Sequence, residues 1–176
     1  MLAMRVVHSL LLLLSLCMIA QSAWGVDHRS KNKAIVERYF HEVLDRKQFQ
    51  LIRELYADDS VIEFPGRPII KGPAAMERAV RDALSQASTF RTDILNLVAE
   101  GDLVVARIEH DARYEEGFMW RNRDGITPTR LPMTRAHWAA MTLFRIERGK
   151  IVEQWISRDE LGVLLQNGAI SVEPLR

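Results

Sequence analysis

The chain has 176 residues and a formal net charge of +1, with 24 Lys and Arg against 23 Asp and Glu. This length is enough for one ordinary hydrophobic core, so we expect a single folded domain. A net charge so close to zero gives no electrostatic reason to expect a nucleic-acid-binding protein, since such proteins neutralise phosphates with many Lys and Arg.

The first 25 residues are typical of a secretory signal peptide. Arg5 gives a positive start, an apolar run follows from Leu10 to Ile19, and small residues flank a cleavage point at Ala23–Gly25. The apolar run is shorter than the roughly 20 residues that span a bilayer. We therefore predict cleavage before Val26 and export of a mature domain, residues 26–176, to the periplasm or the medium, with no further membrane contact. An uncleaved membrane anchor is the alternative.

The mature domain contains no cysteine, because Cys17 lies inside the predicted signal peptide. Disulfides and thiol nucleophiles are therefore excluded from it. The five histidines are isolated, without the spacing of zinc ligands, and no glycine-rich phosphate loop occurs. The sequence predicts no metal and no cofactor.

Helices are predicted in the first half of the mature domain. Apolar residues, Tyr39 among them, recur at helical spacing from Lys31 to Leu44, and a second short helix is predicted over 49–56. Gly72 and Pro73 begin a third helix, since proline suits the first helical turn.

Strand patterns dominate the second half. A short strand is predicted over 60–64, and four longer ones over 90–99, 103–114, 133–146 and 151–157. Helices followed by consecutive strands predict an α+β domain with a curved antiparallel sheet.

The segment 115–132 is polar and rich in turn residues. Its position between two strands predicts a long loop at the mouth of a pocket, where Phe118, Met119 and Trp120 would form an apolar lid. An ordinary loop, with a few apolar side chains on the sheet, is the alternative.

Strand alternation assigns side chains to two faces of the predicted sheet. On strand 103–114, His110 and Tyr114 share the apolar face that must look inward, whereas Arg107, Glu109 and the two charged residues that follow at alternate positions face solvent. His110 is either a satisfied core histidine or a catalytic group.

The strand 133–146 alternates in the same way. Trp138 is assigned to the pocket or the core. The opposite face has an apolar centre at Ala139, Met141 and Leu143, which no remaining helix covers, so we predict a homodimer that buries this face.

Asp159 follows the last predicted strand and precedes a short apolar helix. A carboxylate at the floor of a pocket is partly desolvated, which raises its pKa toward the range of a general acid or base. Aspartate is also a preferred N-cap, so Asp159 either transfers protons or begins the helix.

The stretch Gly149–Gly168 reads Gly-Lys-Ile-x-Glu-x-Trp-x-x-x-Asp-x-x-Gly-x-Leu-x-Gln-x-Gly. It resembles the C-terminal signature of the SnoaL-like polyketide cyclases, also called ester cyclases, of the nuclear transport factor 2-like superfamily. Gly125–Thr129 is similar to their Gly-x-x-Pro-Thr segment, and limonene epoxide hydrolase is similar around Asp159. The resemblance implies a cone-shaped fold around a pocket, with Asp159 as the acid/base. Tyr114 and Glu63 fall where the cyclases often have histidines.

Two functions remain open. The first is a cofactor-free cyclase or isomerase-type enzyme that acts by proton transfer on a small apolar ring or ester compound, as the resemblance implies. In it Asp159 exchanges the proton, and His110 or Tyr114 donates a hydrogen bond to the developing oxyanion. The second is a non-catalytic module that binds or carries a small hydrophobic ligand in the same pocket. The residues expected to contact the ligand are Tyr114, Glu63, Trp138, Trp155, Phe118, Trp120 and Tyr39.

Overall fold

The computed structural model describes residues 28–121, 128–131, 134–166 and 170–171, and for 118–121 and 128–131 it describes the backbone alone. The predicted signal peptide lies outside these residues. In the part of the chain that the structure describes, none of the helices has both the length and the apolar character needed to cross a bilayer.

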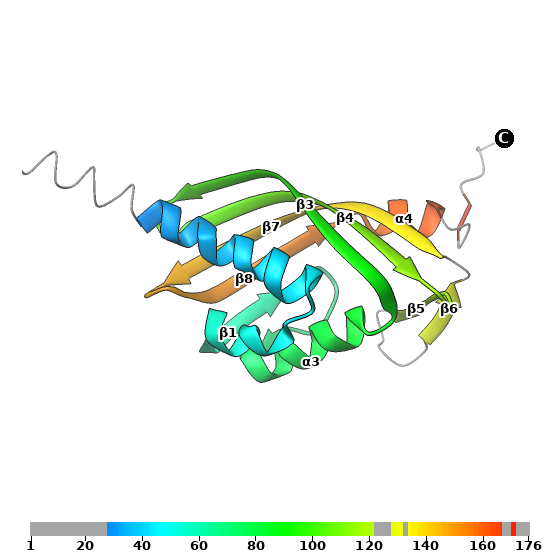
Figure 1. Ribbon diagram of the computed structural model, residues 1–176, viewed down its shortest axis with the longest axis horizontal. Helices are drawn as coiled ribbons and strands as arrows, with labels where there is room; N and C mark the ends of the chain where they lie inside the picture. Colours follow the sequence, from blue (N-terminus) through cyan, green and yellow to red (C-terminus); the bar gives the residue numbers. More distant parts are fainter. Residues whose placement is uncertain (1–27, 122–127, 132–133, 167–169, 172–176) are drawn as a thin grey trace, which may run out of the picture.

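Helices occupy the positions that the apolar spacing predicts. The described chain contains four helical segments, drawn in Figure 1: residues 28–38 continued by the π-helix η1 (Tyr39–Asp45), the 3-10 turn η2 (Phe49–Leu51) continued by α2 (Ile52–Leu55), α3 (Pro73–Leu84), and α4 (Glu160–Gln166). Each of the first three segments turns apolar side chains toward the sheet, since Val36, Ile52 and Met76 are at most 2% exposed. Burial of these faces, rather than helix propensity, holds such short helices in place.

Six strands form one curved sheet in the order β2-β1-β8-β7-β4-β3 (Figure 1). Their bounds are β1 (Tyr56–Glu63), β2 (Ile70–Lys71), β3 (Ala87–Glu100), β4 (Leu103–Tyr114), β7 (Arg135–Glu147) and β8 (Lys150–Arg158). All neighbours pair antiparallel except β1 and β8, which run parallel. The predicted α+β cone is confirmed. The sheet is mixed, because β1 lies between β2 and the last strand, β8, and runs parallel to β8.

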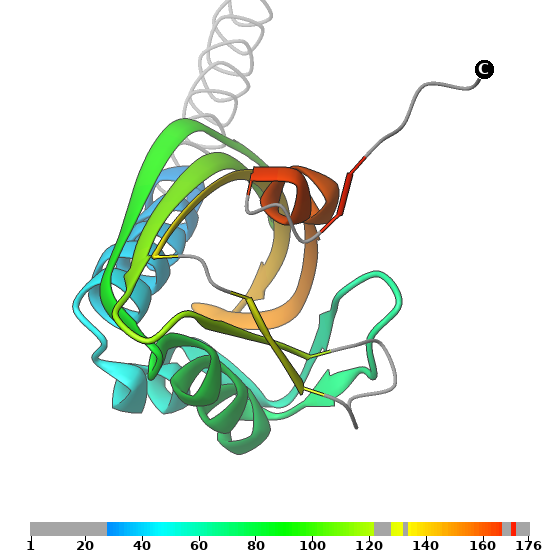
Figure 2. The same cartoon turned by 90° about the vertical axis from the view of Figure 1, so that its right-hand side faces the viewer.

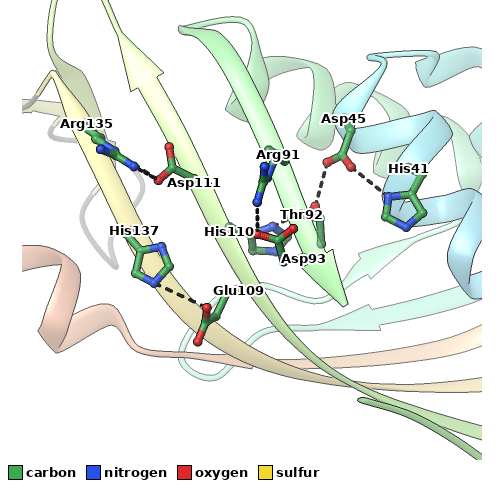
Figure 3. Close-up of polar contacts among 10 residues, drawn as sticks. All are labelled: His41, Asp45, Arg91, Thr92, Asp93, Glu109, His110, Asp111, Arg135 and His137. Atoms are coloured by element: carbon green, nitrogen blue, oxygen red, sulfur yellow. Dashed lines mark hydrogen bonds and ion pairs between the residues drawn. The ribbon is translucent and has the colours of Figure 1, made fainter. Parts of the chain in front are cut away.

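The two faces of β4 are those that the alternation predicts. On the inner face Val104, Ala106 and Ile108 are at most 1% exposed. On the outer face Asp111 accepts a hydrogen bond of 2.6 Å from Arg135 on β7. Figure 3 shows this ion pair on the side of the sheet away from η1, which is drawn in cyan. The predicted charged stripe is therefore confirmed as a solvent-facing set of cross-strand pairs.

The interior of the cone is anchored by aromatic rings. Phe40 on η1 meets Phe144 on β7 edge to face, with 5.8 Å between ring centroids, and Tyr39 lies 5.7 Å from the same ring. All three side chains are at most 3% exposed. These contacts hold the first helix across the concave face of the sheet, which Figure 2 shows end-on.

The segment predicted as a long loop contains a hairpin. Strand β5 (Phe118–Arg121) pairs antiparallel with β6 (Pro128–Leu131), with Phe118 opposite Leu131. Both views place this hairpin at the end of the sheet where α4 also lies (Figures 1 and 2). The prediction of a long loop was therefore wrong for residues 118–121 and 128–131, which form strands. The side chains proposed as a lid, Phe118, Met119 and Trp120, lie outside the described residues.

Candidate active site inside the cone

A cavity of about 520 Å³ lies between the concave face of the sheet and the helices. This volume is in the range of sites for small organic molecules. Most of the lining is aliphatic or aromatic. The apolar lining residues include Phe40, Leu44, Met76, Val80, Phe90, Ile108, Trp138, Ile156 and Val163. The polar and charged side chains among them are therefore the ones that can orient a ligand or react with it.

His110 lies on this cavity and is 6% exposed. Its ring packs 4.9 Å from the centroid of Phe90 and 5.2 Å from that of Trp138. Burial, and after it the nearby positive charge of Arg158, lowers the pKa of His110 to about 3. The imidazole is therefore neutral in the folded protein at any physiological pH.

A hydrogen-bond chain behind His110 fixes its tautomer (Figure 3). Thr92 Oγ1 lies 3.0 Å from His110 Nδ1 and donates its proton to Asp45 Oδ1 over 2.8 Å. A hydroxyl group has one proton to donate, so Nδ1 must be the donor toward Thr92. The neutral ring then has its lone pair on Nε2, which makes Nε2 a hydrogen-bond and proton acceptor.

The hydrogen-bond chain continues from Asp45 to the protein surface. Asp45 Oδ2 lies 3.0 Å from Nδ1 of His41, whose side chain is 46% exposed. The His110–Thr92–Asp45–His41 chain thus joins a buried imidazole to a solvent-exposed one. Such a chain orients the inner ring and lets the Asp45 carboxylate act on it through Thr92.

The π-helix η1 positions both the cavity wall and this chain. Its hydrogen bonds run farther along the chain than in an α-helix, since Arg46 N donates to His41 O at 3.2 Å. The widened turn brings Tyr39, Phe40 and Leu44 to the cavity and ends at Asp45, beside Thr92 of β3. π-helical turns are rare in proteins, and those that occur are often found at functional sites.

Arg158, the last residue of β8, also lines the cavity. Its guanidinium carbon lies 6.0 Å from the ring centroid of Trp138, and its Nε donates to Glu160 Oε1. Tyr114 lines the same cavity, and burial raises its pKa to about 12 against the opposing effect of Arg158. The phenol is therefore a neutral hydroxyl, and Arg158 supplies positive charge beside it and His110.

A second set of polar side chains, apart from Arg158, is formed by Tyr56, Gln154 and Tyr39. Tyr56 Oη donates to Gln154 Oε1 over 2.5 Å, and both side chains are at most 1% exposed. Tyr39 packs edge to face on Tyr56, and burial raises the pKa of both phenols. Tyr39 and Gln154 line the cavity, so they can form hydrogen bonds with an oxygen of a ligand without ionisation of either residue.

The model of the SnoaL-like domain matches residues 36–154, which is more than half of the chain. The chain belongs to the SnoaL-like family. The nuclear transport factor 2-like cone of this family agrees with the architecture described above. A search of the curated proteins finds no match for this SnoaL-like protein.

Solved structures share the fold of this SnoaL-like protein. TsrD from Streptomyces laurentii has a TM-score of 0.65 at 22% identity, over 81% of this chain and 98% of that one. A candidate SnoaL-like polyketide cyclase from Jannaschia sp. CCS1 has a TM-score of 0.67 at 19% identity, over 81% of this chain and 95% of that one. An epoxide hydrolase from M. tuberculosis, similar to limonene epoxide hydrolase, has a TM-score of 0.62 at 16% identity, over 80% of this chain and 86% of that one. At these identities the likeness shows the fold alone.

Asp159 does not face the cavity of this SnoaL-like protein. Its side chain is exposed, and its Oδ1 accepts a hydrogen bond of 2.8 Å from the backbone N–H of Gly162. A Cβ added at Gly162 would overlap the Asp159 carboxylate, so glycine leaves room for it to fold over the first turn of α4. The prediction that this carboxylate sits at the pocket floor was wrong, and the N-cap interpretation describes what it does in the structure.

Two other expected ligand contacts lie on the outer face of the sheet. Glu63 is exposed and is paired in register with Trp155, which lies beside the Arg145 guanidinium at 5.9 Å. Neither residue lines the cavity. The structure instead brings Tyr39, His110, Tyr114 and Trp138 together around it, as their assigned faces predict, and their roles stay predictions. Among the described side chains no cluster of three or more His, Cys, Asp and Glu could hold a metal ion.

Arg158, Thr92 and Asp45 were not among the predicted site residues. Alternation along β8 puts Gln154, Ile156 and Arg158 on one face, and that pattern could have shown that Arg158 and not its neighbour Asp159 reaches inward. Thr92 and Asp45 are 47 residues apart and carry no local signal. Only the pairing of β3 with β4 and the π-turn of η1 bring them behind His110.

Proposed function

We propose that this SnoaL-like protein catalyses a cofactor-free proton transfer on a small apolar ring or ester compound. Membership of the family supports a cyclase or isomerase-type activity. The observation that supports the chemistry is His110, a neutral imidazole on an apolar cavity whose Nδ1–H is directed at Thr92, so that Nε2 is the proton acceptor. This assignment replaces Asp159 as the acid/base and replaces the donor role expected for His110.

The proposed reaction begins when Nε2 removes a proton from a carbon next to a carbonyl group. The electron pair of the broken C–H bond moves onto the carbonyl oxygen, which becomes an enolate. Arg158 and Tyr114 donate hydrogen bonds to this oxygen, and the Asp45 carboxylate, acting through Thr92, stabilises the imidazolium. In isomerisation the enolate takes the proton back from Nε2 at another atom. In ring closure the enolate carbon attacks a second carbonyl of the same molecule, and the oxygen of that carbonyl takes the proton from Nε2 as the C–C bond forms.

Binding without catalysis is the second candidate function. Among the described side chains that line the cavity, the acidic one is Asp82, and it is exposed to solvent. The cavity therefore also suits a protein that only binds a hydrophobic ligand, in which His110 is a satisfied core histidine.

Deuterium exchange separates the two functions. The protein is incubated in D2O with 1-indanone, a bicyclic apolar ketone, and loss of the α-proton signal is followed by NMR. The enzymatic proposal predicts exchange well above the buffer rate and saturable in the ketone. Saturable binding of the ketone with exchange at the buffer rate would leave the binding function in its place.

The outer face of the sheet supports our proposal of a homodimer. Cross-strand register aligns Val98, Val105, Leu143 and Trp155 in one row over four strands. Val98 is 62% exposed and the nearby Met141 54%. An apolar row of this kind is typical of an interface. We expect a dimer in sedimentation at micromolar concentration, and a monomer there would contradict the proposal.

Export is likewise a proposal. Its support is the charged start, the apolar run and the small residues within residues 1–25. The first residue of a mature, exported form would be Val26, which N-terminal sequencing of the protein from its own cells would show.

A further inference from the structure

Two arginines converge on one end of the cavity. Arg158 ends β8, and Arg67 lies in the turn that follows β1, where its N–H bonds to the Phe64 carbonyl at 3.1 Å. Because β1 and β8 run parallel, their carboxyl ends meet at the same end of the sheet. Both side chains line the cavity. The parallel pair therefore brings two guanidinium groups to one opening.

Among the described side chains, the two arginines share one carboxylate, that of Glu160. Arg158 Nε and Arg67 Nη2 both lie near the same oxygen, Glu160 Oε1, the latter at 3.5 Å. Burial and the charge of Arg158 lower the pKa of Arg67, which Glu160 partly offsets. The other described charge on the cavity lining is the exposed Asp82. Among the described side chains, one carboxylate oxygen thus lies near both guanidinium groups.

The Arg158 guanidinium is held in place while its outer edge is available. Its side chain is 24% exposed, lies over the Trp138 ring and uses Nε for Glu160. No hydrogen bond from its two Nη groups occurs among the described residues. A guanidinium fixed by stacking and one hydrogen bond presents a planar pair of donors, which matches a carboxylate or a related oxyanion.

We propose that the natural ligand is an apolar ring compound that carries an anionic oxygen group, a carboxylate or an equivalent, bound by Arg158 and Arg67. Its apolar body would fill the cavity toward His110. This inference names the ligand class of the proposed active site and rests on that cavity being the ligand site. An anion at Arg158 also offsets the positive charge that disfavours the imidazolium form of His110, so the base becomes stronger when such a ligand is bound.

Two fluorescent probes that differ in one anionic group test the proposal. Both carry the phenyl-naphthylamine body: 8-anilinonaphthalene-1-sulfonate has a sulfonate, and N-phenyl-1-naphthylamine has none. Kd is measured for each probe, with 1-indanone as a competitor that reports binding in the cavity. We expect the wild-type protein to bind the sulfonate at least about 10-fold more tightly, as hydrogen bonds between charged groups provide.

The Arg158→Gln variant should lose this preference, with the Kd of the sulfonate rising roughly 10- to 100-fold and that of the neutral probe unchanged. Arg67→Gln should lose a smaller part. Arg135→Gln is the matched control, because Arg135 pairs with Asp111 as Arg158 pairs with Glu160, but on the outer face. Unchanged binding of the neutral probe shows that the Arg158 variant is folded.

Three results would overturn the inference. They are tighter binding of the neutral probe by the wild type, a sulfonate preference that survives Arg158→Gln, and an equal loss in the Arg135 control. In each of them the neutral probe still binds, so the proposed function stands. If neither probe competes with 1-indanone for the wild-type protein, the cavity is not the ligand site and both proposals fail.

Discussion

The His110→Gln variant is expected to exchange the α-protons of 1-indanone roughly 100- to 10,000-fold more slowly than the wild type, which is the usual contribution of a positioned general base. Glutamine is similar in size and can bond to Thr92, so Kd for the ketone should change little. The variant is therefore expected to lower the rate of proton transfer and to leave ketone binding nearly unchanged. It is measured as the NMR exchange rate under saturating ketone.

Asp159→Asn is the control for this experiment. Asparagine is as good an N-cap as aspartate, so the first turn of α4 should be kept. Because Asp159 is exposed and bonded to Gly162, the exchange rate should stay within about 2-fold of the wild type, since only groups that reach the reacting atoms contribute to general-base catalysis. Loss of exchange in Asp159→Asn with full exchange in His110→Gln would return the acid/base role to the aspartate.

The second large effect is on stability at acid pH. In the unfolded chain His110 takes up a proton below about pH 6.5, whereas in the folded protein it stays neutral down to about pH 3. The unfolded state therefore binds more protons across this window, and the free energy of unfolding falls as the pH is lowered. The slope for one such group is about 1.4 kcal/mol per pH unit.

The His110→Phe variant isolates this contribution from that of the carboxylates. The His110 ring packs against Phe90 and Trp138, apolar surroundings that suit phenylalanine, and phenylalanine cannot be protonated. Between about pH 6 and pH 4 the stability advantage of the wild type over the variant should shrink by about 2 to 3 kcal/mol. Urea unfolding across this range gives the difference. An advantage that is constant with pH would mean that His110 is protonated in the folded protein.

Strand alternation accounts for the part of the site that the sequence predicts. On β4 the inward positions carry apolar residues and the outward ones charged residues, so the faces of His110 and Tyr114 follow from the sequence alone. The charges of β4 then find partners on the neighbouring strand, as Asp111 does with Arg135. The same periodicity places Trp138 of β7 on the cavity.

Where alternation breaks, the prediction fails. Along β8 both Ile151 and Gln154 are buried, although three positions apart, because the register shifts opposite Arg145 and Ile146 of β7. The face of Trp155 cannot be counted from Ile151 through such a bulge. The exposure of Asp159 had a different cause, since a residue that follows a strand and caps a helix is oriented by the cap.

The proposed proton transfer requires a neutral His110 imidazole whose lone pair on Nε2 faces the ligand. This requirement is tested most directly by the ¹⁵N chemical shifts of the His110 ring, recorded between about pH 7 and pH 4 with and without 1-indanone. We predict a proton on Nδ1 and none on Nε2 throughout, with a shift of Nε2 when the ketone binds. A ring protonated on Nε2, or one that does not respond to the ketone, would contradict the proposed proton transfer.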